Sequence, residues 1–185
     1  LGLNFFYKAF KTDHLENSIK GVRALQIRGC SVSMPYKEKV IEYIDELDLS
    51  AKQVKAVNTI VNVNGKLIGY NTDVVSLKKC LKKISKNKNQ TIFVLGAGGM
   101  SRAVLVALDY LKMKNIMITN RTMSKGKKIA KEFDLEFIPW KNRNNIQADI
   151  IINSTSIGMY PIILESPLSD KMIKKSKIIV DVVSN

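Results

Sequence analysis

The chain has 185 residues, 45% of them hydrophobic, a composition typical of a globular protein with one ordinary domain or two small ones. No apolar run approaches the roughly 20 residues that a membrane-spanning helix needs, and the first residues lack the pattern of a secretory signal. The formal net charge is +14, but the lysines that produce it are spread along the chain, which favours solvated surfaces over a nucleic-acid groove. We therefore expect a cytoplasmic protein that binds neither nucleic acid nor a membrane.

Residues suited to metal or redox chemistry are few. Cys30 and Cys80 have no Cys or His close by in sequence, and His14 lies on a predicted helix without a second ligand near it. We expect no metal site and interpret all of them as packing or surface residues.

The first half of the chain alternates strand and helix patterns. Apolar residues at helical spacing, such as Leu15, Ile19 and Val22, predict helices, and β-rich runs on both sides of Asn64-Gly65 predict a hairpin. In chain order, the predicted elements are a strand at 4–10, a helix at 13–25, a strand at 29–33, a helix at 37–47, strands at 58–63 and 66–70, and a helix at 73–84. We expect them to form one α/β unit, residues 1–87.

The polar segment 85–90 separates this unit from a new pattern, so we place a domain boundary there and assign 88–185 to a second unit. The predicted elements are strands at 91–95, 115–119, 136–138, 149–153 and 177–183, with helices at 101–112 and 124–133. Regular alternation of strand and helix predicts a parallel, doubly wound sheet of the Rossmann type.

A glycine-rich turn directly follows the first strand of the second unit and opens a helix. The motif consists of Gly96, Ala97, Gly98, Gly99 and Met100. In this context Gly96 permits a tight turn, Gly98 lets a pyrophosphate approach the backbone, and the helix amino terminus favours an anion. Ser101 stands where the usual pattern has a third glycine. The turn therefore predicts a dinucleotide site.

The end of the next strand helps to choose between the two nicotinamide dinucleotides. An NAD site usually has an acidic residue there, whereas a 2′-phosphate favours arginine and other donors. No acid occurs here: Arg121 and Lys125 offer charge, and Asn120 and Thr122 offer hydrogen bonds. The alternative is a helix start capped by Thr122 or Ser124 with solvated cations around it. We favour NADP over NAD.

Two ionisable residues are candidates for chemistry on a ketone. Hydride addition makes the ketone oxygen negative, and a lysine with a carboxylate partner supplies the proton that this oxygen needs. Lys37 follows a strand and Pro35, and Asp73 begins a helix. The alternatives are a surface lysine and a helix-capping aspartate.

Six segments in a fixed order carry a resemblance to a known family. They are SVSMPYK at 31–37, AVNT at 56–59, GYNTD at 69–73, GAGGM at 96–100, NRTMSK at 120–125 and NSTSIGM at 153–159. Together they resemble the substrate and cofactor motifs of the shikimate dehydrogenase family. The amino-acid sequence is most similar to the subgroup called shikimate dehydrogenase-like proteins. The resemblance covers essentially the whole chain.

The resemblance implies a substrate-binding catalytic unit at 1–87, a Rossmann NADP-binding unit at 88–185, and reversible reduction of 3-dehydroshikimate to shikimate by NADPH. It implies that Lys37 transfers the proton with Asp73 as its partner. Carried over residue by residue, Ser33 and Asn58 contact the substrate together with this pair. The loop residues Ser156, Gly158 and Met159 lie beside the nicotinamide.

Family members also have an N-terminal strand with a serine loop and a C-terminal part that this sequence does not show, so we expect it to lack both ends. Val182 and Ser184 stand where the family commonly has Met and Tyr. Two alternatives stay open: a dehydrogenase for quinate or another hydroxylated ring acid, and a truncated nucleotide-binding protein without catalysis.

Overall fold

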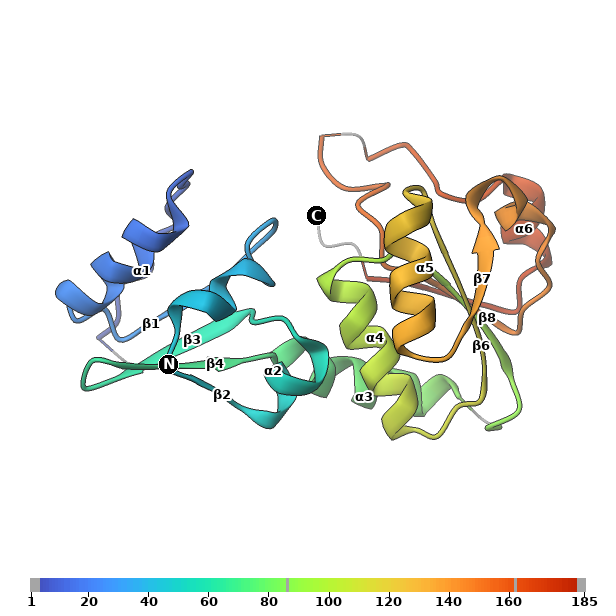
Figure 1. Cartoon of the computed structure of the whole chain (residues 1–185). Coiled ribbons are helices and arrows are strands. Elements are labelled where there is room, and N and C mark those ends of the chain that lie inside the picture. Colours follow the sequence, from blue (N-terminus) through green and yellow to red (C-terminus); the bar gives the residue numbers. More distant parts are fainter. Residues whose placement is uncertain (1–3, 86, 162, 183–185) are drawn as a thin grey trace.

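The computed structural model describes residues 4–85, 87–161 and 163–182. It contains a mixed four-stranded sheet and a parallel five-stranded sheet. Figure 1 shows these two sheets in two lobes that lie side by side. This is the α/β architecture that the sequence predicts.

The first lobe is built on the four-stranded sheet. Along the chain it comprises α1 (Leu15–Ala24), β1 (Gly29–Ser31), the 3-10 helix η1 (Lys39–Tyr43), β2 (Glu46–Leu47), α2 (Leu49–Val54), β3 (Thr59–Val63) and β4 (Lys66–Tyr70). The strand order is β1-β3-β4-β2, and β2 runs parallel to β4 while the other pairs are antiparallel. Asn64 and Gly65 have φ angles of 52° and 89°, as a two-residue hairpin turn requires, so the predicted hairpin is confirmed.

The second lobe is built on the parallel sheet. Along the chain, α3 (Thr72–Ile84) is followed by β5 (Thr91–Leu95), α4 (Gly99–Tyr110), β6 (Asn115–Asn120), α5 (Met123–Glu132), β7 (Glu136–Pro139), the 3-10 helix η2 (Trp140–Asn145), β8 (Ile150–Asn153), α6 (Asp170–Lys175) and β9 (Ile178–Asp181). The order β7-β6-β5-β8-β9 places the first strand of this unit at the centre. The predicted Rossmann-type sheet is confirmed. Val183, in the last predicted strand, lies outside the described residues.

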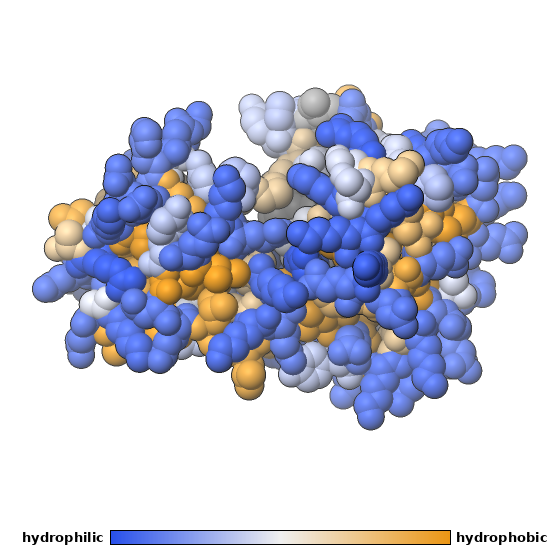
Figure 2. Space-filling model, in the orientation of Figure 1, coloured by the Kyte–Doolittle hydropathy of each residue, from blue (hydrophilic) through white to orange (hydrophobic). Residues whose placement is uncertain are grey.

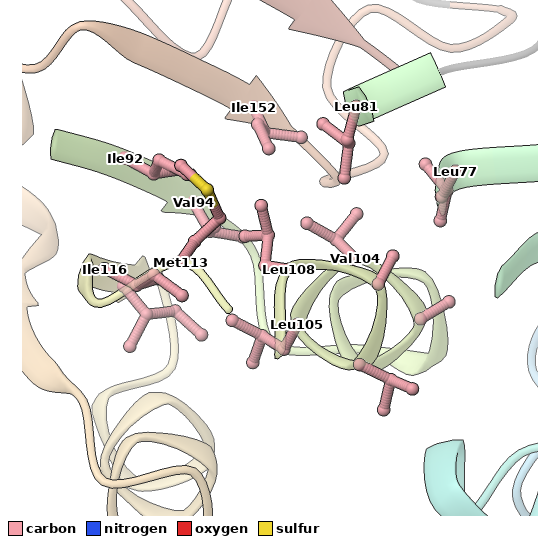
Figure 3. Close-up of a cluster of buried hydrophobic side chains, with 14 of the residues drawn as sticks. Leu77, Leu81, Ile92, Val94, Val104, Leu105, Leu108, Met113, Ile116 and Ile152 are labelled. Carbon is pink, nitrogen blue, oxygen red and sulfur yellow. The ribbon is translucent and has the colours of Figure 1, made fainter. Parts of the chain in front are cut away.

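Helix α3 packs on α4 and joins the core of the second lobe. Leu77 and Leu81 of α3 lie in one buried cluster with Val104 and Leu108 of α4 and Ile152 of β8 (Figure 3). On the opposite face of the five-stranded sheet, Phe93, Leu95 and Ile151 belong to a separate hydrophobic cluster. The helix that follows the first sheet therefore contributes its apolar face to the interior of the second.

The strand predicted at 4–10 is wrong, because these residues form neither helix nor strand. A strand needs a neighbour for its backbone hydrogen bonds, and none of the described strands pairs with this segment. Phe6 and Phe10 are 89% and 80% exposed. The aromatic residues of this segment favour a strand locally, but none of the described strands pairs with it.

The helix predicted at 37–47 is also wrong. Only the middle of this segment is helical, as the 3-10 helix η1, and its end forms the strand β2. Ile44 is extended, with φ −116° and ψ 159°. The carboxylate of Asp45 accepts hydrogen bonds from the Arg23 guanidinium at 2.7 and 3.1 Å and from the Leu67 N–H at 2.7 Å. These contacts and the pairing of β2 with β4 outweigh the helical spacing.

Two short helices, α2 and α6, were not predicted. Asp48 caps α2 by accepting a hydrogen bond from the Ser50 N–H at 2.9 Å, and Ser169 caps α6 by accepting one from the Met172 N–H at 3.4 Å. Each helix is too short to show a clear hydrophobic period. Their capping residues were the available signal.

Figure 2 shows a largely hydrophilic face that is hollowed at the top of the view, between the two lobes. Within the described ranges, no helix has the length and apolar character needed to cross a membrane, and no three His, Cys, Asp or Glu side chains gather as a metal site. Cys30 and Cys80 are free thiols. Burial raises the pKa of the Cys30 thiol, as expected for a packing residue.

Candidate active site

Lys37 and Asp73 form an ion pair at the junction of the two lobes. Lys37 lies on the segment between β1 and η1, and Asp73 lies in the first turn of α3. The Lys37 ammonium nitrogen is 2.9 Å from Asp73 Oδ2, and the two side chains are 18% and 24% exposed. The structure thus brings together the two ionisable residues singled out from the sequence, in a place that a small molecule can reach.

Asn58 fixes the start of α3. Its Oδ1 accepts hydrogen bonds from the Thr72 N–H at 3.0 Å and from the Thr59 hydroxyl at 2.9 Å. Its Nδ2 donates to Thr72 Oγ1 at 3.0 Å, and the same amide carries a second N–H. Asn58 therefore also orients the helix turn that carries Asp73.

Ser33 lies in an exposed tight turn that leads to Lys37. Its carbonyl accepts a hydrogen bond from the Tyr36 N–H at 3.0 Å. The Tyr36 hydroxyl donates to the Thr12 carbonyl at 2.8 Å, which ties this turn to the segment before α1. Ser33 is thus on the same short loop as Lys37.

The glycine-rich turn is held by a chain of hydroxyl groups. The Ser154 hydroxyl donates to the Leu95 carbonyl at 2.6 Å, so the Ser101 hydroxyl is the donor in its 2.8 Å bond to Ser154. Ser101 Oγ in turn accepts from the Gly98 N–H at 3.2 Å. A Cβ on Gly96, whose φ is +115°, would lie 2.9 Å from Ser101 Oγ. The serine in place of the third glycine therefore helps to build the turn.

The turn fits a dinucleotide pyrophosphate. No atom lies within 4 Å of the position where Gly98 would carry a Cβ, so the backbone there is open to a ligand. Gly99 and Met100 begin α4, whose first N–H groups and dipole favour an anion. Ala97 lies between these glycines and is half-buried. All five motif residues lie where the carboxyl end of β5 meets α4.

The residues expected to choose the dinucleotide follow β6. Arg121, Thr122 and Lys125 are exposed, and Asn120 Nδ2 donates to the Thr122 carbonyl at 2.9 Å. Two exposed cations therefore lie at the strand end that faces an adenosine ribose in this fold. Gly126 lets α5 pack closely on the sheet, since a Cβ there would meet the ring of Phe137.

The loop after β8 carries the other predicted cofactor residues. Gly158 has a φ of +92°, and the Met159 N–H donates to the Ser156 carbonyl at 3.2 Å. Asn153, which sequence reasoning missed, orders this loop by accepting from the Thr155 N–H at 3.1 Å and hydroxyl at 2.7 Å. Its position inside the NSTSIGM motif was the available signal.

The Lys37–Asp73 ion pair lies against the glycine-rich turn. The position of a Cβ on Gly99 is 3.8 Å from Lys37 Cβ and Cδ. A cavity of about 230 Å³ adjoins the same place and is lined by Asp73, Ser76, Leu77, Cys80, Met100 and Val182. Ser184, noted with Val182 in the sequence, lies outside the described residues. The arrangement brings an ammonium and a carboxylate group together beside the glycine-rich turn.

Comparison with known proteins gives two matching family models. Residues 1–60 match the shikimate dehydrogenase substrate binding domain, and residues 78–184 match shikimate / quinate 5-dehydrogenase.

Individual relatives agree with these matches. A shikimate dehydrogenase-like protein of Haemophilus influenzae is 46% identical over 159 residues, which cover 86% of this chain and 58% of that protein. The NADP(+) shikimate dehydrogenase of Caldanaerobacter subterraneus subsp. tengcongensis is 38% identical over 195 residues, covering 100% of this chain and 70% of that protein. This chain thus spans between 58% and 70% of the length of these two relatives.

A solved structure shows the same fold. Shikimate 5-dehydrogenase of Thermus thermophilus, in complex with NADP(H) and shikimate, superimposes with a TM-score of 0.79 at 30% identity. The match covers 94% of this chain and 65% of the Thermus chain.

Proposed function

This chain belongs to the shikimate dehydrogenase family, and from that premise we propose that it interconverts 3-dehydroshikimate and shikimate with NADP as the cofactor. The observation that carries the proposal is the Lys37–Asp73 ion pair, 2.9 Å across, beside the glycine-rich turn. The relative from Thermus, solved with both NADP(H) and shikimate, supports it.

The proposed chemistry needs one hydride and one proton. When bound, NADPH supplies the hydride. As the ketone oxygen becomes negative, the Lys37 ammonium donates the proton to it, and in the reverse direction the neutral amine accepts the proton from the alcohol. Asp73 holds the ammonium in place and accepts a hydrogen bond from a neighbouring ring hydroxyl. Both side chains are partly exposed, so Lys37 regains its proton from solvent.

The remaining site residues are assigned as follows. Ser33 and Asn58 bind ring hydroxyls, because a hydroxyl and a free amide N–H at such a site discriminate against analogues that lack them. The N–H groups at Gly99 and Met100 hold the pyrophosphate, which approaches the open backbone at Gly98. For the 2′-phosphate we assign Arg121 and Lys125, with Asn120 and Thr122 as hydrogen-bonding neighbours. Gly96 and Ala97 shape the turn, and Ser156, Gly158 and Met159 border the nicotinamide.

A second candidate substrate is quinate or another hydroxylated ring acid. The family model that matches residues 78–184 covers both shikimate and quinate dehydrogenases, and the Haemophilus relative is named only as a like protein. Val182, at the cavity beside Asp73, replaces the Met common in the family. Its shorter side chain changes the surface available to a ring substituent.

The experiment that tests the proposal is reduction of NADP, followed spectrophotometrically on the complete natural gene product with shikimate, then quinate, and then with NAD replacing NADP. We expect turnover of shikimate with NADP. Turnover of quinate alone selects the second candidate. NADP binding without turnover of either acid refutes the enzyme proposal and leaves a nucleotide-binding protein.

The division into units at 1–87 and 88–185 and the cytoplasmic location stay predictions. The expected absence of nucleic-acid binding stays one as well.

A further inference from the structure

An ion cluster of Lys55, Arg102 and Glu132 crosses from the first lobe to the second. Arg102 of α4 binds both oxygens of Glu132, at 3.0 and 2.9 Å, and the Lys55 ammonium lies 2.6 Å from Glu132 Oε1. The Arg102 side chain is 8% exposed, whereas that of Lys55 is 64% exposed. A carboxylate at the last residue of α5 opposes the helix dipole, so these two cations supply its stabilisation.

Lys55 is followed at once by residues that touch the site. It ends α2 in the left-handed conformation, with φ 55°. Ala56 comes next: its Cβ lies 3.6 Å from the position of a Cβ on Gly99, and its carbonyl accepts a hydrogen bond from Asn71 Nδ2 at 3.0 Å. Asn71 is the N-cap residue of α3, the helix that carries Asp73. The residue after Lys55 therefore lies between the cofactor turn and the helix of the reactive carboxylate.

The next two residues bind the reactive pair more directly. The Val57 N–H donates to the Lys37 carbonyl at 2.7 Å. Asn58 is hydrogen-bonded to Thr72, the residue before Asp73. Segment 55–58 is thus joined to both partners of the ion pair, and at its first residue, Lys55, it forms an ion pair with Glu132 of α5.

We propose that Lys55 is a positioning residue, which through Glu132 holds segment 55–58, and with it Lys37, at a fixed distance from Asp73 and the cofactor turn. The proposal rests on the proposed function for its effect on turnover. Displacement of a reacting group by about 1 Å costs up to about 100-fold in rate, so a modest loosening of this contact has a measurable effect.

The test uses Lys55→Met, which removes the Lys55–Glu132 contact between the lobes and leaves the Arg102–Glu132 pair intact. Lys52→Met, on the exposed side of the same helix, is the matched control, and Lys55→Arg is the conservative variant. We expect kcat of Lys55→Met to fall about 10-fold. We expect the Kd for NADP to stay within about 2-fold, because its proposed binding residues all lie on the second lobe. Lys55→Arg should recover most of kcat.

A second measurement does not depend on turnover. Spin labels at Leu25→Cys and Lys128→Cys, in a background with Cys30→Ser and Cys80→Ser, report the distance between the lobes. Lys55→Met should broaden the distance distribution and Lys52→Met should not. If the protein turns over neither shikimate nor quinate, the proposed function fails. The distance measurement then still tests whether Lys55 holds the two lobes in place. Equal kcat and equal distance distributions for the two Lys→Met variants overturn the proposal.

Discussion

The Lys37 ammonium lies 2.9 Å from the Asp73 carboxylate, although the two residues are 36 positions apart in the chain. Backbone and amide hydrogen bonds from Val57 and Asn58 hold the two segments together. The protein itself therefore sets the geometry of the pair. Preorganisation of this kind lowers the cost of stabilising charge that develops during reaction.

Replacing Lys37 with Met should remove the proton donor and leave the nucleotide turn unchanged. We expect kcat for shikimate oxidation to fall by roughly 100-fold to 10,000-fold, the usual contribution of general acid–base catalysis. The Kd for NADP, measured by fluorescence titration, should stay within about 2-fold. Lys39→Met, on the exposed side of η1, is the control. A Lys37→Met enzyme with a normal kcat would exclude Lys37 as the proton donor.

Asp73→Asn tests whether the pair acts as a unit. The neutral amide keeps the shape but no longer holds the ammonium, so kcat should fall by roughly 100-fold. In the double variant Lys37→Met/Asp73→Asn, the loss should be close to that of the worse single variant, because groups that act together are not additive. A double variant whose loss equals the product of the two single losses would show that the residues act independently.

Arg121→Gln should change the choice of dinucleotide. Loss of a charge-assisted contact to the 2′-phosphate should weaken NADP binding about tenfold, equivalent to about 1.4 kcal/mol. NAD has no such phosphate, so its Kd should not change. Lys125→Gln is expected to act in the same direction and less strongly. An equal loss of affinity for both dinucleotides would place Arg121 at the shared part of the cofactor instead.

Glu132→Gln should destabilise the fold. Arg102 is buried and would lose its charged partner, at a cost of roughly 3 kcal/mol in the free energy of unfolding. Urea denaturation at pH 7 measures it, with the exposed Glu136→Gln as the control. A Glu132→Gln protein as stable as the control would show that Arg102 is adequately solvated without the carboxylate.

The lowered pKa of Glu132 predicts that the free energy of unfolding depends on pH. Hydrogen bonds from Arg102, and then from Lys55, lower the pKa of the Glu132 carboxyl from its ordinary 4.5 to about 2. Since the folded pKa lies below the unfolded one, this stabilisation is complete above about pH 4.5 and is lost as the pH falls towards 2. The stability difference between wild type and Glu132→Gln should therefore narrow below pH 4.5. A constant difference down to pH 3 would contradict the assignment.

Two glycines within helices should respond to alanine in opposite ways. Gly126 of α5 lies against the ring of Phe137, so Gly126→Ala should cost roughly 1 to 3 kcal/mol of stability through overpacking. Gly21 of α1 has no atom within 4 Å of its Cβ position, so Gly21→Ala should stabilise by about 0.5 to 1 kcal/mol. Thermal unfolding compares them. Equal effects would show that α5 shifts freely on the sheet.

Features decided by neighbouring residues could be predicted from the sequence. The Asn64-Gly65 hairpin, the glycine-rich turn at Gly96 and the parallel second sheet depend on local turn chemistry and hydrophobic period. The partnership of Lys37 with Asp73 followed from the family motifs, and the structure shows the contact.

Features decided by residues far apart in the sequence could not be predicted. Asp45 is held by Arg23 and Leu67, which turned an expected helix into a strand. Glu132 is 77 residues from Lys55, and nothing in the sequence around either residue indicates their contact. Such partners become visible only when the tertiary structure brings the segments together.

Helices α3 and α4 contribute to one hydrophobic core, which determines what happens when the chain is split between them. Leu77 and Leu81 belong to the first half of the sequence but are covered by α4 and β8 of the second (Figure 3). If the coding region were split between the codons for residues 87 and 88, each polypeptide would expose an apolar surface that the other one covers. The two pieces should aggregate when produced separately and reassemble when produced in the same cell, which makes this position suitable for a split-reporter design.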